Sequence, residues 1–260
     1  MKIVSLSSGS DGNAYCLNCN GSLLLVDCGI SCRELSKRCE NCGVDLSAVI
    51  GVVFTHNHRD HTKGIKTFHK KFPGAELFAN MMTAEAIAED YDMDTEDWIV
   101  FENNQSFGIG SFEINPFSIS HDVPDPVGYF ITSDDGDRYF HATDLGIATD
   151  TIGRYFSKAR VATLESNHDP ILLCQSNRPE DLKMRISGPR GHLSNDQAAE
   201  FIMKYAGENL QTIALAHLSE ECNAPHLAIN AAKDALKRIR REDVNLKYLL
   251  HDKPLPITGV

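Results

Sequence analysis

Residues 55–61 read Thr-His-Asn-His-Arg-Asp-His, and they decide how the rest of the chain is interpreted. They directly follow Gly-Val-Val-Phe at 51–54, an apolar run that predicts a buried strand. Polar side chains at this density do not form a hydrophobic core, because polar groups buried without partners cost several kcal/mol. On a loop at the end of a strand, however, the same side chains can converge on metal ions. The alternative, a surface loop with incidental histidines, explains this density poorly.

The residue types in this stretch indicate which metals would bind. Imidazole nitrogens and carboxylate oxygens suit zinc, manganese or iron better than calcium. His56 and His58 are two residues apart, so their side chains point to the same side and can bind one ion. Asp60 and His61 then face a second ion. We therefore expect two divalent ions, zinc or manganese, with iron as a further option.

Three more polar residues follow apolar, strand-like runs later in the chain. His121 follows 112–120, Asp144 follows 137–143, and His217 follows 212–216. Domains of the α/β class place their functional groups at such strand ends. Together with residues 55–61, these positions favour a site with two metal ions.

Strand and helix patterns alternate along the chain and predict a layered α/β domain. We see no repeat and no Gly/Ser/Pro-rich linker, so residues 1–260 are expected to form one domain. The expected strands are 1–7, 14–19, 22–27, 48–56, 76–80, 160–166, 212–219 and 246–251, and the expected helices are 31–42, 62–71, 81–91, 149–158, 196–206 and 224–241. Residues 98–144 are expected to be β-rich, with a hairpin turn at 134–137.

Composition excludes several classes of protein. The chain has no apolar run near the ~18 residues that a membrane helix needs. Its N-terminus becomes polar after six residues, unlike a signal peptide, so we expect a cytoplasmic protein without a membrane partner. The net charge of −11 argues against a protein that coats nucleic acid.

The charges are distributed unevenly, and this reopens the question of a nucleic-acid substrate. Residues 59–71 hold five basic side chains and one acid, whereas residues 83–104 hold eight acids and no base. Lys183, Arg185 and Arg190 lead into the loop at 191–195. A local positive channel beside the metal ions is sufficient for one strand end of a nucleic acid.

Eight cysteines leave three interpretations open. The pairs Cys16–Cys19 and Cys39–Cys42 each have the C-x2-C spacing of a zinc knuckle. Free thiols are the preferred interpretation, because small buried thiols are common in strands and helices. Redox disulfides are the third interpretation, disfavoured by the reducing cytosol.

The series His56-x-His58-x-Asp60-His61 with His121, Asp144 and His217 resembles the metallo-β-lactamase superfamily over nearly the whole chain. The resemblance implies a four-layer αββα sandwich. It also implies that Asp27, in the run 23–29, orients the metal-binding loop from behind the ligands. The implied ligand sets are His56, His58 and His121 for one ion, Asp60, His61 and His217 for the other, and Asp144 as a bridge between them.

Shorter segments narrow the resemblance to the YycJ/WalJ group, which implies a nuclease with 5′→3′ DNA exonuclease activity. These segments are 7–15, 165–169, 191–199 and 217–223. Residues 191–199 also resemble the tRNA 3′-processing endonuclease RNase Z, which implies that His192 protonates the leaving oxygen and that Glu165 orients it. The chain has no long insertion resembling the RNase Z arm, and it is too short for a β-CASP domain. Glyoxalase-type thioesterases share the ligands but not segments 165–169 and 191–195.

The expected mechanism is metal-dependent hydrolysis of a phosphodiester. Asp60 would bind metal and orient the attacking water, while His192, or as second choice His168, would protonate the leaving oxygen. Asn167, Ser194 and Asn195 are candidate substrate contacts, or else turn and cap residues. The alternatives are an RNA-processing nuclease, a small-molecule phosphodiesterase, a thioesterase or lactamase, and a binding protein without turnover.

Overall fold

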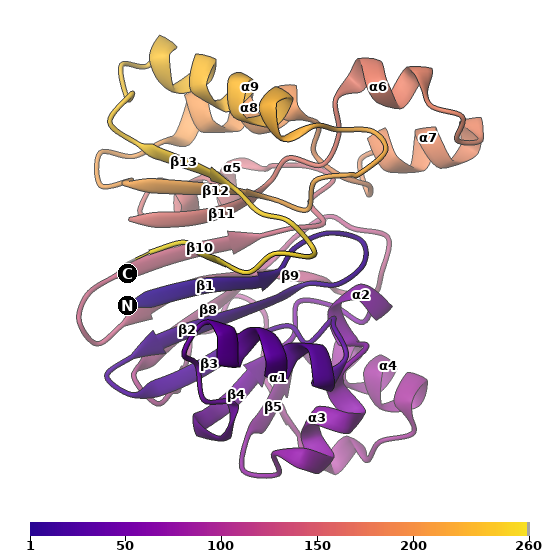
Figure 1. Cartoon of the computed structure of the whole chain (residues 1–260), viewed down its shortest axis with the longest axis vertical. Coiled ribbons are helices and arrows are strands. Elements are labelled where there is room, and N and C mark those ends of the chain that lie inside the picture. The colour runs from indigo at the N-terminus through magenta and orange to yellow at the C-terminus, as the bar shows by residue number, and fades with distance from the viewer. Residues whose placement is uncertain (259–260) are drawn as a thin grey trace.

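Two seven-stranded sheets pack face to face in the computed structural model, which describes residues 1–258 (Figure 1). Helices cover the outer surface of each sheet, so the chain forms four layers. The αββα sandwich expected from the sequence is confirmed. The core between the sheets contains aromatic side chains from both, including Tyr15 from one sheet and Tyr129 from the other.

The first sheet begins with antiparallel strands and continues with parallel ones. Asn20 and Gly21 join β2 to β3 with φ angles of 51° and 88°, the left-handed conformation that a tight hairpin turn needs. Its order is β14-β1-β2-β3-β4-β5-β6, with pairing parallel from β3 onward. The strands are β1 (Lys2–Ser7), β2 (Ala14–Cys19), β3 (Ser22–Val26), β4 (Val49–Val53), β5 (Glu76–Ala79), β6 (Trp98–Val100) and β14 (Leu255–Pro256).

The second sheet repeats this plan with antiparallel strands first and parallel strands after them. Its order is β13-β12-β11-β10-β9-β8-β7, and the pairing is parallel from β10 to β13. The strands are β7 (Phe107–Ile109), β8 (Phe112–Ser118), β9 (Val127–Ser133), β10 (Arg138–Ala142), β11 (Val161–Glu165), β12 (Thr212–Ala216) and β13 (Asn245–Tyr248).

Three of the longer helices, α1, α4 and α8, begin at a residue whose side chain caps them. Ser194 and Gln197 form a capping box at the start of α8, as the sequence predicts. No helix among residues 1–258 is both long and apolar enough to cross a membrane. Helices α1 (Cys32–Asn41), α3 (Ile65–Lys71) and α4 (Met81–Tyr91) lie on the first sheet, and α5 (Asp150–Phe156), α8 (Asn195–Tyr205) and α9 (Pro225–Arg238) lie on the second.

Two short helices between β11 and α8 are not among the elements expected from the sequence. They are α6 (Pro170–Gln175) and α7 (Glu180–Ser187), and they project beside the second sheet (Figure 1). The start of α6 does carry a sequence signal, because Asp169 caps it and Pro170 occupies its first turn. Both helices are too short for a clear hydrophobic period.

The cysteine geometry excludes the zinc knuckle. Cys16 and Cys19 are three residues apart on β2, so their side chains lie on opposite faces of the sheet. Cys16 packs with Cys39 under the helices, whereas Cys19 lies in the core between the sheets. All eight cysteines are free thiols, as preferred from the sequence, and burial raises the pKa of Cys16 to about 12.

Candidate metal centre

The polar residues that follow the parallel strands of both sheets meet at one end of the sandwich. Asp27 follows β3, Asp144 follows β10, and His217 follows β12. These three residues have φ angles of 61°, 58° and 56°, an uncommon conformation for residues other than glycine. Such strained backbone persists where the surrounding structure holds it and is frequent at functional sites.

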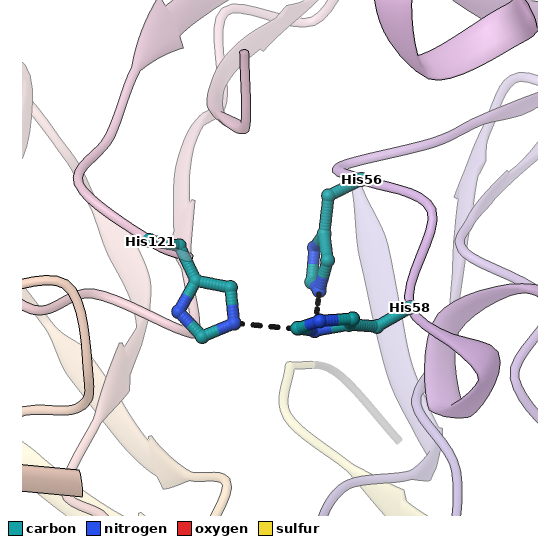
Figure 2. Close-up of side chains that lie close together, drawn as sticks. All are labelled: His56, His58 and His121. Atoms are coloured by element: carbon teal, nitrogen blue, oxygen red, sulfur yellow. Dashed lines mark hydrogen bonds between the residues drawn. The ribbon is translucent and has the colours of Figure 1, made fainter. Parts of the chain in front are cut away.

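Three histidine rings converge on one point (Figure 2). His56 and His58 come from the loop between β4 and the short helix α2 (Arg59–Thr62), and His121 follows β8. Nε2 of His56 and Nε2 of His121 each lie 3.2 Å from Nδ1 of His58. A cation between these nitrogens would satisfy all three lone pairs, so the three rings could hold one metal ion.

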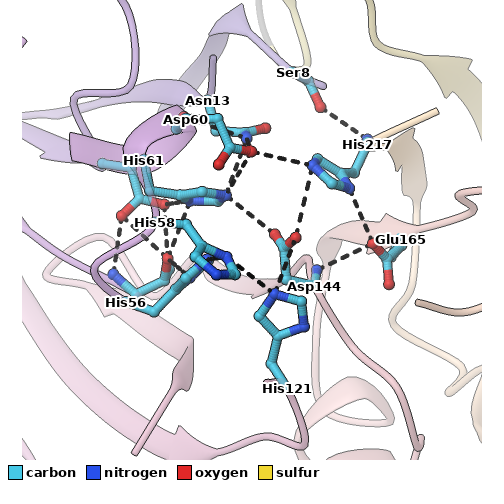
Figure 3. Close-up of polar contacts among 12 residues, drawn as sticks. Ser8, Asn13, His56, His58, Asp60, His61, His121, Asp144, Glu165 and His217 are labelled. Atoms are coloured by element: carbon cyan, nitrogen blue, oxygen red, sulfur yellow. Dashed lines mark hydrogen bonds and ion pairs between the residues drawn. The ribbon is translucent and has the colours of Figure 1, made fainter. Parts of the chain in front are cut away.

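A second group lies beside the first and contains a carboxylate (Figure 3). Oδ2 of Asp60 lies 3.6 Å from Nε2 of His61 and 3.6 Å from Nε2 of His217. Asp60 and His61 come from α2, while His217 follows β12 in the other sheet. The two sheets therefore both contribute to this second group, which could also hold a metal ion.

Asp144 lies between the two groups and reaches both (Figure 3). Its Oδ2 lies 3.1 Å from Nε2 of His61, and its Oδ1 lies 3.6 Å from Nε2 of His217. The same Oδ1 lies 3.8 Å from Nε2 of His121, which belongs to the first group. One buried carboxylate thus faces nitrogen atoms of both groups.

In His61, His121 and His217, the ring nitrogen that points away from the cluster has a hydrogen-bond acceptor, which sets the tautomer of the ring. With Nδ1 donating its proton, a neutral imidazole keeps a free lone pair on Nε2, the form that binds metal. His61 Nδ1 donates to Asp27 Oδ2 at 2.7 Å, His217 Nδ1 donates to Glu165 Oε1 at 3.1 Å, and His121 Nδ1 donates to the Gly191 carbonyl at 3.3 Å.

The electrostatics of the cluster also favour a cation. Oδ2 of Asp144 and Nε2 of His217 are buried and have no hydrogen-bond partner among the described residues. Burial lowers the pKa of His217, but Asp144, Asp60 and Glu165 outweigh it and raise this pKa to about 10. The carboxylates therefore keep His217 protonated in the place where a divalent ion would supply positive charge. Binding of the metal would release this proton. The residues of the cluster fit a divalent metal.

Asp27 supports the cluster from behind. It is fully buried, accepts the His61 proton, and also accepts from the Thr55 backbone N–H at 2.9 Å. Asp27 therefore fixes both Thr55, where the loop at 55–61 begins, and the ring of His61.

We expect Asp27→Asn to weaken metal binding by about 10–100-fold, because an amide can no longer set the His61 tautomer. Competition with a chromogenic chelator measures this affinity. Asp45→Asn is the matched control, since Asp45 also accepts a backbone N–H, from Ser47, but lies on the surface. Equal affinity in Asp27→Asn and the wild type would show that Asp27 does not orient the ligand.

Asn13 belongs to the cluster but is missing from the residues expected from the sequence. Its Nδ2 lies 3.3 Å from Oδ2 of Asp60 and 3.0 Å from Nε2 of His61. Its backbone N–H donates to the Asp60 carbonyl at 2.7 Å. Gly29 allows this approach, because a Cβ there would lie 1.7 Å from the same carbonyl oxygen. In the sequence, the only indication of a role for Asn13 was the resemblance of segment 7–15 to the YycJ/WalJ group. That resemblance did not distinguish Asn13 from its neighbours.

Glu165 and His192 form a pair at the edge of the cluster. Glu165 is fully buried and accepts from Nδ1 of His192 at 2.9 Å. It also accepts the backbone N–H groups of Asp144, Leu145 and Leu193. Burial raises the pKa of Glu165, but His192 and the hydrogen bonds it receives lower this pKa to about 2. Glu165 is therefore an ionised anchor for both the Asp144 turn and the His192 loop.

Four further expected residues lie behind the pocket and do not line it. Asn167, Ser194 and Asn195 are at most 5% exposed. Asn167 donates to the His217 carbonyl at 2.8 Å, while Ser194 caps α8. His168 is 2% exposed, and burial lowers its pKa. These positions hold the loops of His192 and His217 in place.

A cavity of about 280 Å³ opens over the cluster. Its floor contains the side chains of the cluster that reach the surface, namely His58, Asp60, His121, Asp144 and His217, together with His192. The opposite wall contains residues from the region of α6 and α7, namely Arg178, Leu182, Arg185 and Ile186, and Ser10 from the loop between β1 and β2 also lines the cavity. The lysines of α3, expected to supply positive charge here, lie elsewhere. Lys66 pairs with Asp92 at 3.5 Å, so part of the basic segment faces the acidic one.

This geometry agrees with the comparisons to known proteins. The family described as beta-lactamase superfamily domain matches residues 23–217. The chain belongs to this superfamily. That span runs from β3, before Asp27, to His217, so it contains every residue of the two groups.

Within the superfamily, the chain belongs to the WalJ/YycJ-like group. It is 31% identical over 226 residues to exodeoxyribonuclease WalJ of Streptococcus pneumoniae, covering 86% of this chain and 83% of that protein. It is 28% identical over 248 residues to exodeoxyribonuclease YycJ of Bacillus anthracis, covering 95% and 93%. The metallo-β-lactamase fold protein YhfI of Bacillus subtilis superposes with a TM-score of 0.72, at 18% identity and 98% coverage of both chains. That last likeness concerns the fold alone.

Proposed function

We propose that this protein is a phosphodiester hydrolase that uses two divalent ions and acts as a DNA exonuclease in the 5′→3′ direction. The observation that carries the proposal is Asp144, whose carboxylate faces both groups of nitrogen ligands. The names of the WalJ and YycJ relatives support DNA as the substrate. The cytoplasmic location stays a prediction from the sequence.

Each residue of the cluster has a role in this proposal. Zinc or manganese fits the donors, with iron as a further option. When bound, the two ions activate a water molecule and neutralise charge on the phosphate. The ligands are His56, His58 and His121 for one ion, Asp60, His61 and His217 for the other, and Asp144 for both.

The chain's own groups would handle the protons. Asp60 is a ligand on the floor of the cavity, where it can also orient the attacking water. Hydrolysis breaks the bond between phosphorus and the 3′ oxygen, and that oxygen needs a proton to leave. His192 can donate it from Nε2, because Nδ1 is bonded to Glu165 at 2.9 Å. Burial lowers the pKa of His192, but Glu165 outweighs this effect and raises it, which favours the protonated ring that a proton donor needs.

The test is a substrate panel with the purified protein, stripped of metal and then reloaded with Zn²⁺ or Mn²⁺. We expect 5′-labelled DNA to release mononucleotides, 3′-labelled DNA to shorten progressively, and the metal-free protein to be inactive. RNA, bis(p-nitrophenyl) phosphate and a thioester complete the panel. Internal cuts, a preference for RNA, or activity restricted to the small ester or the thioester would each contradict the proposal.

A further inference from the structure

The wall opposite the metal ligands has a mixed chemical character. Leu182, Arg185 and Ile186 line the cavity from α7, at a spacing that places them on one helix face. Arg178, between α6 and α7, lines it as well. Two cations and two aliphatic side chains therefore face a floor of carboxylates and imidazoles.

The two arginines are attached to the loops that carry opposite ends of the ligand cluster. Nε of Arg185 donates to Oδ2 of Asp122 at 2.5 Å, and Asp122 adjoins His121. Nε of Arg178 donates to Oε2 of Glu221 at 3.0 Å, and Glu221 lies on the loop that begins at His217. One guanidinium is thus fixed on the side of His121 and the other on the side of His217.

Both arginines leave their terminal nitrogens available. Among residues 1–258, no protein group accepts a hydrogen bond from an Nη atom of Arg178 or Arg185, which are bonded through Nε alone. Arginines with a structural role differ in this respect. Nη1 of Arg38 donates to the Leu6 carbonyl, and both Nη atoms of Arg241 donate to backbone carbonyls. A guanidinium fixed through Nε presents its two Nη groups in the geometry that binds phosphate bidentately.

We propose that Arg178 and Arg185 bind two phosphates of a nucleic-acid strand, one on each side of the phosphate that is cleaved. Leu182 and Ile186 then pack against the sugar or base between them. This inference rests on the proposed function and narrows its substrate class to a polynucleotide with phosphates flanking the cleaved bond. A cyclic nucleotide or a simple diester fills the metal site and leaves both arginines unused.

The experiment measures binding without turnover. The probe is a fluorescent single-stranded oligonucleotide with phosphorothioate linkages, titrated with the Zn²⁺-loaded protein and read by anisotropy over a range of salt concentrations. We expect Arg178→Gln and Arg185→Gln each to raise Kd about tenfold, since each removes a bond to a charged group. The slope of log Kd against log salt should fall by about 0.7 for each arginine. Turnover of bis(p-nitrophenyl) phosphate, which has no flanking phosphates, should stay within about twofold of the wild type.

Arg160→Gln is the matched control. Arg160 is also exposed and paired with an aspartate, Asp137, but it does not line the cavity. Metal content and the melting temperature establish that each variant is folded and loaded. The Arg→Lys variants should keep the salt slope but recover only part of the affinity, because lysine lacks the planar fork.

Three results separate this inference from the proposed function. If the double variant binds with the affinity and salt slope of the wild type, the phosphate sites are wrong whatever the enzyme cleaves. If both variants lose turnover of bis(p-nitrophenyl) phosphate to the same degree as they lose oligonucleotide binding, the arginines act through the metal ligands. The inference then also fails. If the variants weaken binding and lower the salt slope as expected, but the wild type cleaves no DNA, the exonuclease proposal fails. The two phosphate sites at Arg178 and Arg185 then stand.

Discussion

Asp144→Asn is expected to lower kcat by about 10³-fold and to release metal, because an amide presents one weak oxygen where the carboxylate presents two charged ones. The effect should exceed that of losing one histidine, since Asp144 faces nitrogens of both groups. Turnover of labelled DNA and metal content by mass spectrometry measure the two losses. Asp150→Asn is the control, since Asp150 is an exposed aspartate that pairs with Lys204.

The metal count decides how this result is interpreted. Loss of both ions together with activity supports a shared ligand. A variant that keeps two ions and most of its activity would contradict the bridging role of Asp144 and leave two separate groups.

His192→Ala is expected to lower kcat on DNA by about 10²–10⁴-fold while metal content stays complete. His192 is not one of the proposed metal ligands; it pairs with Glu165 and lines the cavity. The loss should be much smaller on a p-nitrophenyl ester, because p-nitrophenolate leaves without being protonated. Comparing the two substrates therefore separates a proton donor from a residue that only shapes the pocket.

The pH profile provides a second measurement of the same role. A proton donor works only while it holds its proton, so wild-type activity should fall as pH rises through the His192 pKa, which lies above its ordinary value. That basic limb should be absent from His192→Ala. His226→Ala is the control, because His226 is exposed at the start of α9, away from the cavity, and should leave kcat unchanged. An identical basic limb in His192→Ala would assign the proton to another group.

The local part of the site could be predicted from the sequence because its residues are close neighbours in the chain. His56, His58, Asp60 and His61 lie within one loop and one short helix, so their spacing alone restricts where they can point. The strand-end rule then indicated His121, Asp144 and His217. Asp144 and His217 follow parallel strands, whose carboxyl ends meet at one edge of a sheet, whereas His121 follows the antiparallel strand β8. The alternation of strand and helix patterns predicted the layered fold.

Residues in long-range networks were assigned less well. The sequence left Asn167 and Asn195 open as substrate contacts or as turn and cap residues, and in the structure they bond to neighbouring loops and lie buried. Asn13 was overlooked although it contacts Asp60 across a large sequence separation. An asparagine carries no signal of its partner, because turns, caps and ligand contacts all use this residue type.

The sequence by itself therefore predicted a layered α/β domain, which the family resemblance specified as an αββα sandwich. It also predicted the candidate metal ligands and the chemistry that those side chains suit. The tertiary structure alone decided that Glu165 bonds to His217 as well as to His192, and that Asn13 joins the cluster. It also decided that Arg178 joins Arg185 over the site, and that the lysines of α3 do not line it. The physical reason is the range of the contacts. Ligand identity follows from local spacing, whereas the wall of a cavity depends on how segments far apart in the chain pack together.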